Sequence, residues 1–334
     1  MAVEVDPNER REATPDEDED DRLSDTSSSL IETRSEEYPL YFIERDNRLF
    51  PSHGYPRYPF PVDTYEQERM NDQHDLLRVH LGGNIVAPVR QLLSQRPSQR
   101  QLIVLDLCTG TGKWPVEMAQ EFPHVKFNAL DIVPICTQYP PKNVNFVLWD
   151  ASTRTWFPNA SLDFVHARHC ELLPADKYIA MLTEASRVLR PGGLIFLGEW
   201  FHLPVDAAGV SPPGVVAFYQ ALNSSLYFDY WIPTIPPFLV QIISQLGGFD
   251  DIQTRDYCIP IGDWAPNAAR DLGVEFRNTL KTWVESATVV IAKAGHDEAA
   301  INKLVYDFLS DIFNIPGLHI AYRTVTARRT TPRT

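Results

Sequence analysis

The sequence has few cysteines, and it has no long apolar run. The four cysteines are far apart and form no Cys-x-x-Cys pair; they are Cys108, Cys136, Cys170 and Cys258. This spacing argues against a disulfide framework and predicts reduced thiols, as in a cytoplasmic or nuclear protein. No window reaches the roughly 18 apolar residues of a membrane-spanning helix. The acidic N-terminus also lacks the apolar core of a secretory signal. We therefore expect a cytoplasmic protein, with the nucleus as the alternative and no membrane partner.

Positive charge is also scarce. The formal net charge is −14, and residues 1–37 hold fourteen acidic residues and four arginines, or −10 of that total. The rest of the chain is close to neutral, so it lacks the basic face typical of nucleic-acid-binding proteins. No nucleic-acid partner is expected. Residues 1–37 are too polar to fold alone and are predicted to be a disordered acidic tail. The tail either keeps the protein soluble or is a regulatory segment phosphorylated around Ser24–Ser29.

An aromatic arm and two helices are predicted for residues 38–100. Residues 38–62 are rich in Tyr, Phe and Pro, which predicts an ordered extended arm, because so many aromatic rings are costly to leave in water. A helix follows, with Asp63 or Thr64 as its N-cap, a capping box formed by Thr64 and Gln67, and an end at Gly82. A shorter helix is expected over 85–93. We expect this region to cover a site in the domain that follows.

Residues 101–330 alternate between strand and helix patterns, which predicts a parallel α/β sheet. The expected strands are 102–107, 125–130, 145–148, 162–166, 194–198, 252–259 and 319–327. The expected helices are 114–122, 175–189, 237–246, 266–292 and 297–313. Residues 201–236 interrupt this alternation. They are rich in proline, carry an aromatic cluster at 227–231, and are predicted to be an insertion that caps the site.

The rest of the chain is organised around the stretch Leu102–Ala119, which reads as a buried strand, a glycine loop and the first turns of a helix. Such a loop lets the backbone approach a ligand closely. A dinucleotide-binding fingerprint needs a third glycine three residues after the second, but Gly112 is followed by Lys-Trp-Pro. Asp106, at the end of the strand, would repel a phosphate and suits a ligand with an ammonium group.

Two further acids follow the next two predicted strands. Asp131 ends the second strand, where its carboxylate can accept both hydroxyls of a ribose, and Asp150 follows the third, where it can accept from an adenine amino group. Together with Asp106 they lie at the carboxyl ends of neighbouring strands, where open α/β sheets bind ligands. A ligand with an amino acid end, a ribose and an adenine is S-adenosylmethionine, which is the predicted cofactor.

The motifs also resemble a known family. LDLCTGTG is similar to motif I of class I S-adenosylmethionine-dependent methyltransferases, with Cys108 where a glycine is usual, and RVLRPGG is similar to their motif after strand 4. The segments YPFPVDTYEQERMNDQHDLL, PIGDW and HIAYRTVTARR resemble the fungal LaeA-like methyltransferases, over roughly residues 50–330. The resemblance implies a Rossmann-like α/β fold with a seven-stranded, mostly parallel sheet, S-adenosylmethionine as cofactor and a role in fungal secondary metabolism. Some members are regulators in a nuclear complex, and others methylate small molecules.

The candidate site combines these motifs. The predicted cofactor-binding residues are Asp106, Thr109, Gly110, Gly112, Asp131, Ile132, Asp150, Ala151, Arg168 and Arg69. Arg69 can pair with the cofactor carboxylate, or it can be a helix residue at ion-pair spacing from a glutamate. The candidate catalytic residues are His169 and Glu171, which follow the fourth strand and can accept a proton. They can equally be structural, because methyl transfer can proceed by in-line placement alone.

Other groups are weighed beside them. Glu199 and Trp200 form a second candidate pair at the tip of strand 5. No metal is expected, because His166 and His169 lack a third ligand. Tryptophans and a tyrosine are candidates for an aromatic acceptor pocket, with core packing as the alternative; they are Trp114, Trp149, Trp156, Trp231 and Tyr227. We expect methyl transfer to O or N of a small-molecule acceptor. The alternative is a LaeA-like regulator that acts within a protein complex.

Overall fold

The computed structural model describes residues 39–52, 58–97, 100–201, 203–229 and 235–330, and the side chains of 227–229 lie outside that description. All described residues belong to one compact unit, Thr33–Thr334. The predicted tail at 1–37, the side chain of Tyr227 and the whole of Trp231 therefore lie outside the described residues.

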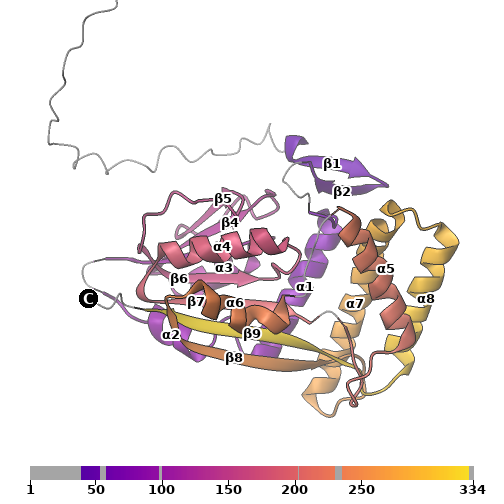
Figure 1. The fold of residues 1–334 in the computed structure, drawn as a ribbon. Helices are drawn as coiled ribbons and strands as arrows, with labels where there is room; N and C mark the ends of the chain where they lie inside the picture. Colours follow the sequence, from indigo (N-terminus) through magenta and orange to yellow (C-terminus); the bar gives the residue numbers. More distant parts are fainter. Residues whose placement is uncertain (1–38, 53–57, 98–99, 202, 230–234, 331–334) are drawn as a thin grey trace, which may run out of the picture. The chain divides into compact units, whose positions relative to one another are not determined.

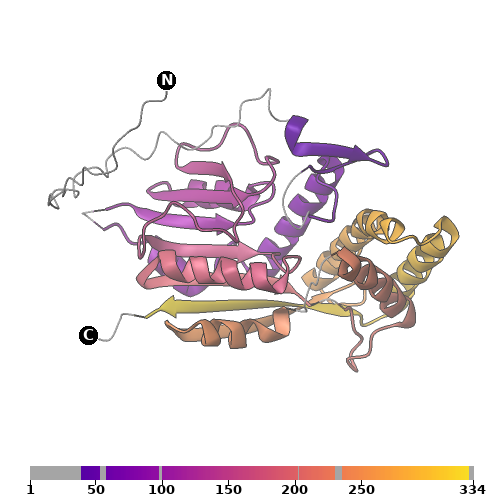
Figure 2. The ribbon, with the colours of Figure 1, turned by 45° about the horizontal axis from the view of Figure 1, so that its top comes forward.

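A seven-stranded sheet forms the centre of the fold (Figure 1). Its strands are β3 (Leu102–Leu107), β4 (Val125–Asp131), β5 (Val144–Leu148), β6 (Leu162–Arg168), β7 (Leu189–Trp200), β8 (Phe249–Pro260) and β9 (His319–Arg329). The order across the sheet is β5-β4-β3-β6-β7-β9-β8, and β9 runs antiparallel to both of its neighbours. The predicted seven-stranded, mostly parallel sheet is confirmed, and Figure 2 shows β9 in yellow running along it.

Helices cover both faces of this sheet. They are α2 (Ala87–Leu93) and α3 (Lys113–Glu121) on one face, and α4 (Ala175–Val188), the short 3₁₀ helix η3 (Pro236–Phe238) and α6 (Leu239–Leu246) on the other. Alternation along β3 explains the two layers. Leu102 and Val104 pack with α2 and α3, whereas Leu105 and Leu107 pack with α4 and α6. A strand buried on both faces reads as a continuous apolar run, so its prediction was confirmed residue for residue.

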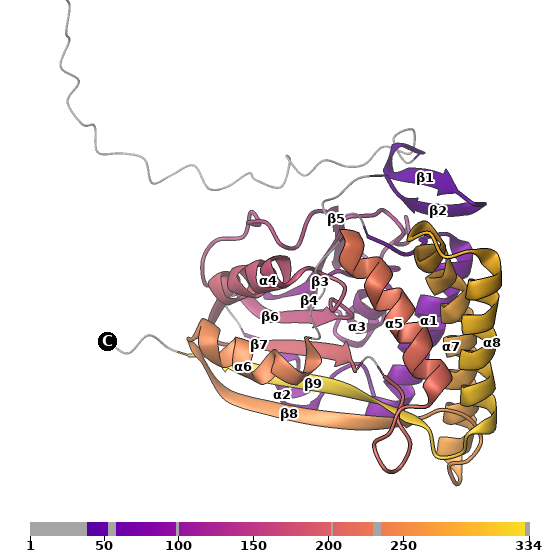
Figure 3. The same ribbon diagram turned by 45° about the vertical axis from the view of Figure 1, so that its right-hand side comes forward.

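A third core lies among the remaining helices, α1 (Thr64–Leu81), α5 (Pro213–Asp229), α7 (Ala268–Lys293) and α8 (Glu298–Asn314). Figure 3 shows α5 beside α8, with α7 and α1 next to them. Phe218 of α5 contacts Phe308 of α8 and Trp283 of α7, with ring centroids 5.0 and 5.9 Å apart. The segment predicted to be a proline-rich insertion therefore contributes a long helix to this core.

The N-terminal region differs from the predicted extended arm. Residues Phe42–Arg45 and Arg48–Pro51 pair as an antiparallel hairpin, β1 and β2, turning at Asp46 and Asn47, which both have positive φ. The predicted capping box is also wrong. Asp63 is the N-cap and accepts from the Glu66 backbone, while the Gln67 amide donates to the Val62 carbonyl. An aspartate fits this position because its short carboxylate reaches the free backbone N–H groups of the first turn.

Strand β7 begins earlier than predicted. The run Arg190-Pro-Gly-Gly was expected to end the helix before a strand that begins at Leu194, but Leu189 already pairs with Leu162 of β6, and the register shifts before Phe164 pairs with Leu194. Strand β7 therefore continues through the proline and the glycines, with a local shift in its pairing register. Turn residues alone do not reveal this outcome, because it depends on the pairing partner.

Candidate functional site

A cavity of about 230 Å³ opens at the carboxyl ends of β3, β4, β5 and β6. The order of the sheet reverses next to β3, which is where open α/β sheets place their ligands. Ten of the twelve predicted site residues line this cavity; they are Asp106, Thr109, Gly110, Asp131, Ile132, Asp150, Ala151, Arg168, His169 and Arg69. The two that do not are Gly112 and Glu171.

Asp131 joins the glycine loop to the end of β4. Its carboxylate accepts from the backbone N–H of Gly110 at 2.7 Å and from that of Val133 at 3.1 Å. Burial raises the pKa of Asp131 to about 6, although these N–H groups and that of Ile132 oppose the shift. A carboxylate oxygen carries two lone pairs, so the same group retains capacity for ribose hydroxyls.

Asp106 is more deeply enclosed than its predicted role requires. It is 3% exposed, and its two oxygens contact His166 Nδ1 at 2.6 Å and accept from the Thr109 hydroxyl at 2.5 Å. The indole of Trp114 stacks on the face of the His166 ring. Asp106 therefore orders the loop through side chains, and an ammonium contact would come in addition to these bonds. No sequence signal identified these contacts among Asp106, His166 and Trp114.

The third acid lies where an adenine is expected. Asp150 accepts from the backbone N–H and the hydroxyl of Ser152 at 2.8 and 2.6 Å. Ile132, Trp149 and Ala151 also line the cavity, and the indole N–H of Trp149 is buried with no acceptor among the described residues. The lining around Asp150 in the sequence therefore combines apolar contacts with polar groups, as a purine requires.

Arg168 supplies positive charge at the end of β6. Its Nη2 lies 2.9 Å from Nδ1 of His74, and its Nε is buried with no acceptor among the described residues. Burial and Arg168 lower the pKa of His74 to about 4, which leaves this imidazole neutral. Arg168 lines the cavity, and a buried guanidinium nitrogen without an acceptor fits the carboxylate of an amino acid ligand. The residues present therefore fit S-adenosylmethionine.

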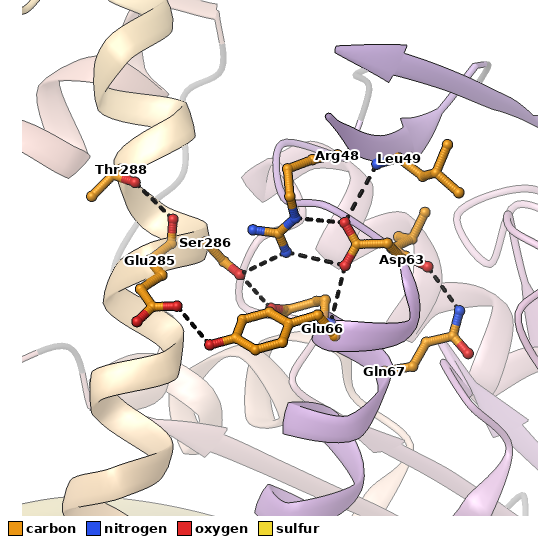
Figure 4. A network of polar contacts seen from close by, with 10 residues as sticks. Arg48, Leu49, Asp63, Glu66, Gln67, Glu285, Ser286 and Thr288 are labelled. Atoms are coloured by element: carbon orange, nitrogen blue, oxygen red, sulfur yellow. Dashed lines mark hydrogen bonds and ion pairs between the residues drawn. The ribbon is translucent and has the colours of Figure 1, made fainter. Parts of the chain in front are cut away.

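Arg69 is held by the protein itself. Its guanidinium contacts Glu66, with Nε 2.8 Å from Oε1, and also donates to the Gln73 amide oxygen at 2.6 Å. The second oxygen of Glu66 accepts from the Ser286 hydroxyl of α7 at 2.6 Å (Figure 4). This pair is buried, unlike the exposed helix pair that the spacing also allowed. A direct contact between Arg69 and the cofactor carboxylate stays a prediction.

Two residues of the glycine loop, Cys108 and Gly112, have a left-handed backbone conformation. Cys108 has φ +55°, a left-handed conformation that glycine adopts without strain, and this explains why the motif usually has glycine there. Gly112 also has a positive φ, and a Cβ on it would lie 2.4 Å from the Phe146 ring. Gly112 therefore packs against β5 rather than lining the cavity.

His169 follows β6 and lines the cofactor cavity. Its ring is parallel to that of Trp200 with centroids 6.1 Å apart, and its Nε2 lies 3.2 Å from the Gln73 amide nitrogen. Burial, together with Arg168 and Arg69, lowers the pKa of His169 well below its ordinary value. The imidazole is therefore neutral and only weakly basic.

A second cavity of about 130 Å³ adjoins the first, and Arg69, Gln73 and Leu172 line both. Glu171 lies here. The remaining lining is mainly aromatic and apolar and comes from Phe60, β7, α5, α7 and β9. Three of the five predicted rings do not line this cavity, and the other two, the Tyr227 side chain and Trp231, lie outside the described residues. Trp114 and Trp149 line the cofactor cavity and Trp156 packs on Trp149, whereas the second cavity is lined by Trp200, Tyr219, Phe276 and Trp283.

One cluster of possible metal ligands occurs among the described residues, at His74, Asp75 and Glu117. Each is already paired. Lys113 contacts Asp75 at 2.5 Å, and His74 and Asn84 contact the same Glu117 oxygen at 3.0 and 2.8 Å. The neighbouring cations disfavour a metal ion, so this cluster ties α1 to α3.

The strand order and the cofactor cavity define the class I S-adenosylmethionine-dependent methyltransferase fold. A family model described as a methyltransferase domain matches residues 104–193. Methyltransferase pytC of Aspergillus terreus is 27% identical over 229 residues, which cover 64% of this chain and 64% of pytC. Secondary metabolism regulator LAE1 of Cochliobolus heterostrophus is 32% identical over 250 residues, which cover 71% of this chain and 77% of LAE1.

The chain belongs to the LaeA-like family of fungal class I methyltransferases, whose cofactor is S-adenosylmethionine. It spans slightly less than two thirds of the length of pytC. Among solved structures, Haemonchus contortus phosphoethanolamine N-methyltransferase 2 with S-adenosylhomocysteine is similar at 15% identity and a TM-score of 0.46, over 89% of this chain and 72% of that one. That resemblance is too distant to extend to a substrate. No described helix has the length and apolar character needed to cross a membrane.

Proposed function

We propose that the protein transfers a methyl group to O or N of a small aromatic or cyclic molecule in fungal secondary metabolism. The observation that carries this proposal is the second cavity, which adjoins the cofactor cavity and shares Arg69, Gln73 and Leu172 with it. Two bound molecules in adjoining cavities are held close together in a fixed orientation, which is the main requirement of a group transfer.

The cofactor cavity has the groups needed to hold S-adenosylmethionine. Asp131 would accept the ribose hydroxyls, Asp150 would accept from the adenine, and the unpartnered Nε of Arg168 would donate to the carboxylate. When bound, the cofactor supplies an electrophilic methyl group on a sulfonium. The role of this chain is to place a nucleophile in line with that group and to keep water out.

The second cavity suits a flat, apolar acceptor. Tyr219 stacks on Trp283 with centroids 5.4 Å apart, and Trp200 stacks on Phe276 at 5.1 Å, so ring faces and edges form its walls. Asn223 and Thr279 add a few polar groups to this apolar lining. Such a lining gives affinity through apolar contacts and orientation through hydrogen bonds.

Glu171 is the better placed of the two predicted proton acceptors. It lines the second cavity, where the acceptor is proposed to bind, whereas His169 lines only the cofactor cavity. In the proposed reaction Glu171 receives the proton of the acceptor O–H or N–H group. The Glu171→Gln variant removes this proton acceptor with little change in volume.

The experiment fills the second cavity and leaves the cofactor cavity intact. Asn223→Trp on α5 places a ring in the acceptor space, and the adjacent Ser224→Trp places the same ring on an exposed position as the matched control. Each variant replaces the wild-type gene, and metabolites are profiled. We expect Asn223→Trp to lose the methylated compound that is also lost on gene deletion, and Ser224→Trp to retain it. Normal production with Asn223→Trp, from a protein that still binds cofactor, would reject a small-molecule acceptor site.

A second candidate function is regulation of secondary metabolism within a nuclear protein complex. The similarity to the regulator LAE1 over most of that protein favours it. On this alternative, deletion lowers many unrelated compounds, and Asn223→Trp has no effect because the second cavity is not used. Loss of a single methyl group from a single compound supports the enzyme instead.

A further inference from the structure

A buried glutamate, Glu199, lies near the end of β7, next to Trp200 of the second cavity. It is 0% exposed. Its Oε1 accepts from the Tyr178 hydroxyl at 2.9 Å and from the backbone N–H of Cys170 at 3.2 Å. Two donors therefore satisfy one oxygen of this carboxyl group, and they come from α4 and from the loop after β6.

The other oxygen has no such partner. Oε2 of Glu199 is buried with no hydrogen-bond donor among the described residues, and the same holds for Oε2 of Glu171. The two carboxyl groups contact each other through their side chains. Two ionised carboxylates in contact repel, and each would leave a buried acceptor unsatisfied. One proton shared by the two carboxyl groups removes the repulsion and supplies a hydrogen bond between them.

The groups around Glu199 favour its protonated form. The titratable groups that act on the Glu199 carboxyl group are Glu171, Cys170, Cys108 and Tyr178, and none of them is a cation. Tyr322 of β9 lies near both Glu199 and the cation Arg168, which pairs with Gly198 at the end of β6. Arg323 lies opposite Glu199 in the β7–β9 pairing, but its guanidinium is bound to Asp256 at 2.7 Å. Burial and Glu171 raise the pKa of Glu199 well above its ordinary value.

We propose that Glu199 is a neutral carboxylic acid that donates a hydrogen bond to Glu171, and that this bond aims the Glu171 carboxylate into the second cavity. Glu199 is then a positioning residue, and Glu171 is the group that receives the acceptor's proton. In that step the acceptor O–H or N–H bond breaks and an O–H bond forms on Glu171. The role of Glu171 rests on the proposed function, whereas the neutral state of Glu199 does not.

The first test uses stability alone. Glu199→Gln mimics the protonated acid, because its amide N–H can donate to Glu171 while its oxygen still accepts from Tyr178. In the wild type the native state keeps a proton that the unfolded state loses above about pH 4.5, so stability falls as the pH rises. We expect the unfolding equilibrium constant of the wild type to rise relative to that of Glu199→Gln by up to tenfold per pH unit above pH 5. The exposed Glu68→Gln serves as the control and should follow the wild type.

Urea unfolding between pH 5 and 8 measures this difference. A Glu199→Gln protein that is destabilised by the same factor at every pH would overturn the proposal, since an ionised Glu199 predicts that result. This outcome is independent of any methyl transfer, so it separates failure of this inference from failure of the proposed function.

The second test measures transfer of labelled methyl from S-adenosylmethionine to an extract of the deletion strain. We expect Glu199→Gln to lose at most tenfold in rate, and Glu199→Leu and Glu171→Gln to lose at least a hundredfold, with cofactor affinity unchanged. Equal losses for Glu199→Gln and Glu199→Leu would reject the positioning role. If Glu199→Leu does not fold, Glu199→Gln is compared with Glu171→Gln instead. A much smaller loss for Glu199→Gln supports the positioning role, and equal losses reject it. Absence of transfer by the folded wild type would reject the proposed function and, with it, the role assigned to Glu171.

Discussion

The indole of Trp114 lies flat on the imidazole of His166, with ring centroids 3.6 Å apart and ring planes 2° from parallel. On its edge the same imidazole contacts Asp106, with Nδ1 2.6 Å from Oδ1. Burial lowers the pKa of His166 to about 4, although Asp106 opposes the shift. His166 is therefore neutral and carries its proton on Nδ1, and the stack fixes the strand end from which the glycine loop departs.

The first prediction concerns acid stability. Because the native pKa of His166 lies below the unfolded value of about 6.5, the unfolded state takes up a proton first as the pH falls, and this contribution to stability is lost between about pH 6.5 and 4. His166→Asn should destabilise the protein at pH 7.5, and its cost should shrink by about 1–3 kcal/mol at pH 4.5. Urea unfolding measures both values. A cost that does not change with pH contradicts a neutral buried imidazole.

A control separates this effect from other titrations. The pKa of Asp131 is raised to about 6, and the pKa of Glu199 is raised as well. Over part of this range both groups therefore increase the free energy of unfolding as the pH falls, which is opposite to the effect of His166. Only the difference between variant and wild type isolates the histidine. The exposed His296→Gln should give a difference that is small and constant with pH.

The second prediction concerns cofactor affinity. In the proposed cofactor site the ionised form of Asp131 would accept hydrogen bonds from the ribose hydroxyls, so affinity for S-adenosylmethionine should weaken as the pH falls through about 6, approaching tenfold per pH unit. Asp131→Asn should weaken binding by roughly 10–100-fold at pH 7.5, since a hydrogen bond to a charged group contributes about 1.5–3 kcal/mol. Calorimetric titration at pH 7.5, 6.5 and 5.5 tests this. Wild-type affinity that stays constant over the series would speak against the role given to Asp131.

The third prediction concerns Cys108. Its φ of +55° strains any residue with a side chain, and a β-branched residue most of all. Cys108→Gly should fold at least as stably as the wild type and bind S-adenosylmethionine with affinity within threefold. Cys108→Val should lose about 1–3 kcal/mol of stability. Equal stability of the valine and glycine variants would show that this backbone conformation is not required.

The fourth prediction compares two glycines with the same backbone. Gly112 has φ +75° and Gly82 has φ +77°, but a Cβ on Gly112 meets the Phe146 ring at 2.4 Å, whereas nothing lies within 4 Å of one on Gly82. Gly82→Ala should cost about 1 kcal/mol from backbone strain alone. Gly112→Ala adds a clash in the core and should cost at least about 2 kcal/mol. Thermal unfolding of both variants measures the difference, and equal costs would exclude the packing role of Gly112.

Much of the sheet could be predicted because its strands are buried on both faces. Leu102–Leu107 was predicted without error, since an apolar run between polar loops has few other interpretations. The ends of β7 and β8 could not be predicted in this way, because Leu189 and Phe249 extend their strands only through pairing with distant partners. The energy of pairing with a distant strand cannot be predicted from the local sequence pattern.

The cofactor cavity was more predictable than the second cavity. Its acids follow three consecutive strands, and strand ends converge in every open α/β sheet. The walls of the second cavity come from residues as far apart as Phe60, Tyr219 and Trp283, which helix packing alone brings together. The ion pair between Glu66 and Arg69 was visible as a spacing of three residues, but its burial against Ser286 of α7 was not.

The most direct test of the account is calorimetric titration of S-adenosylmethionine into the folded wild type and into Asn223→Trp at pH 7.5. We predict one binding event per chain in both proteins with the same affinity, because Asn223 lines only the second cavity. Absence of binding heat in the wild type, with circular dichroism showing a folded protein, would contradict the assignment of the cofactor cavity and the function that depends on it.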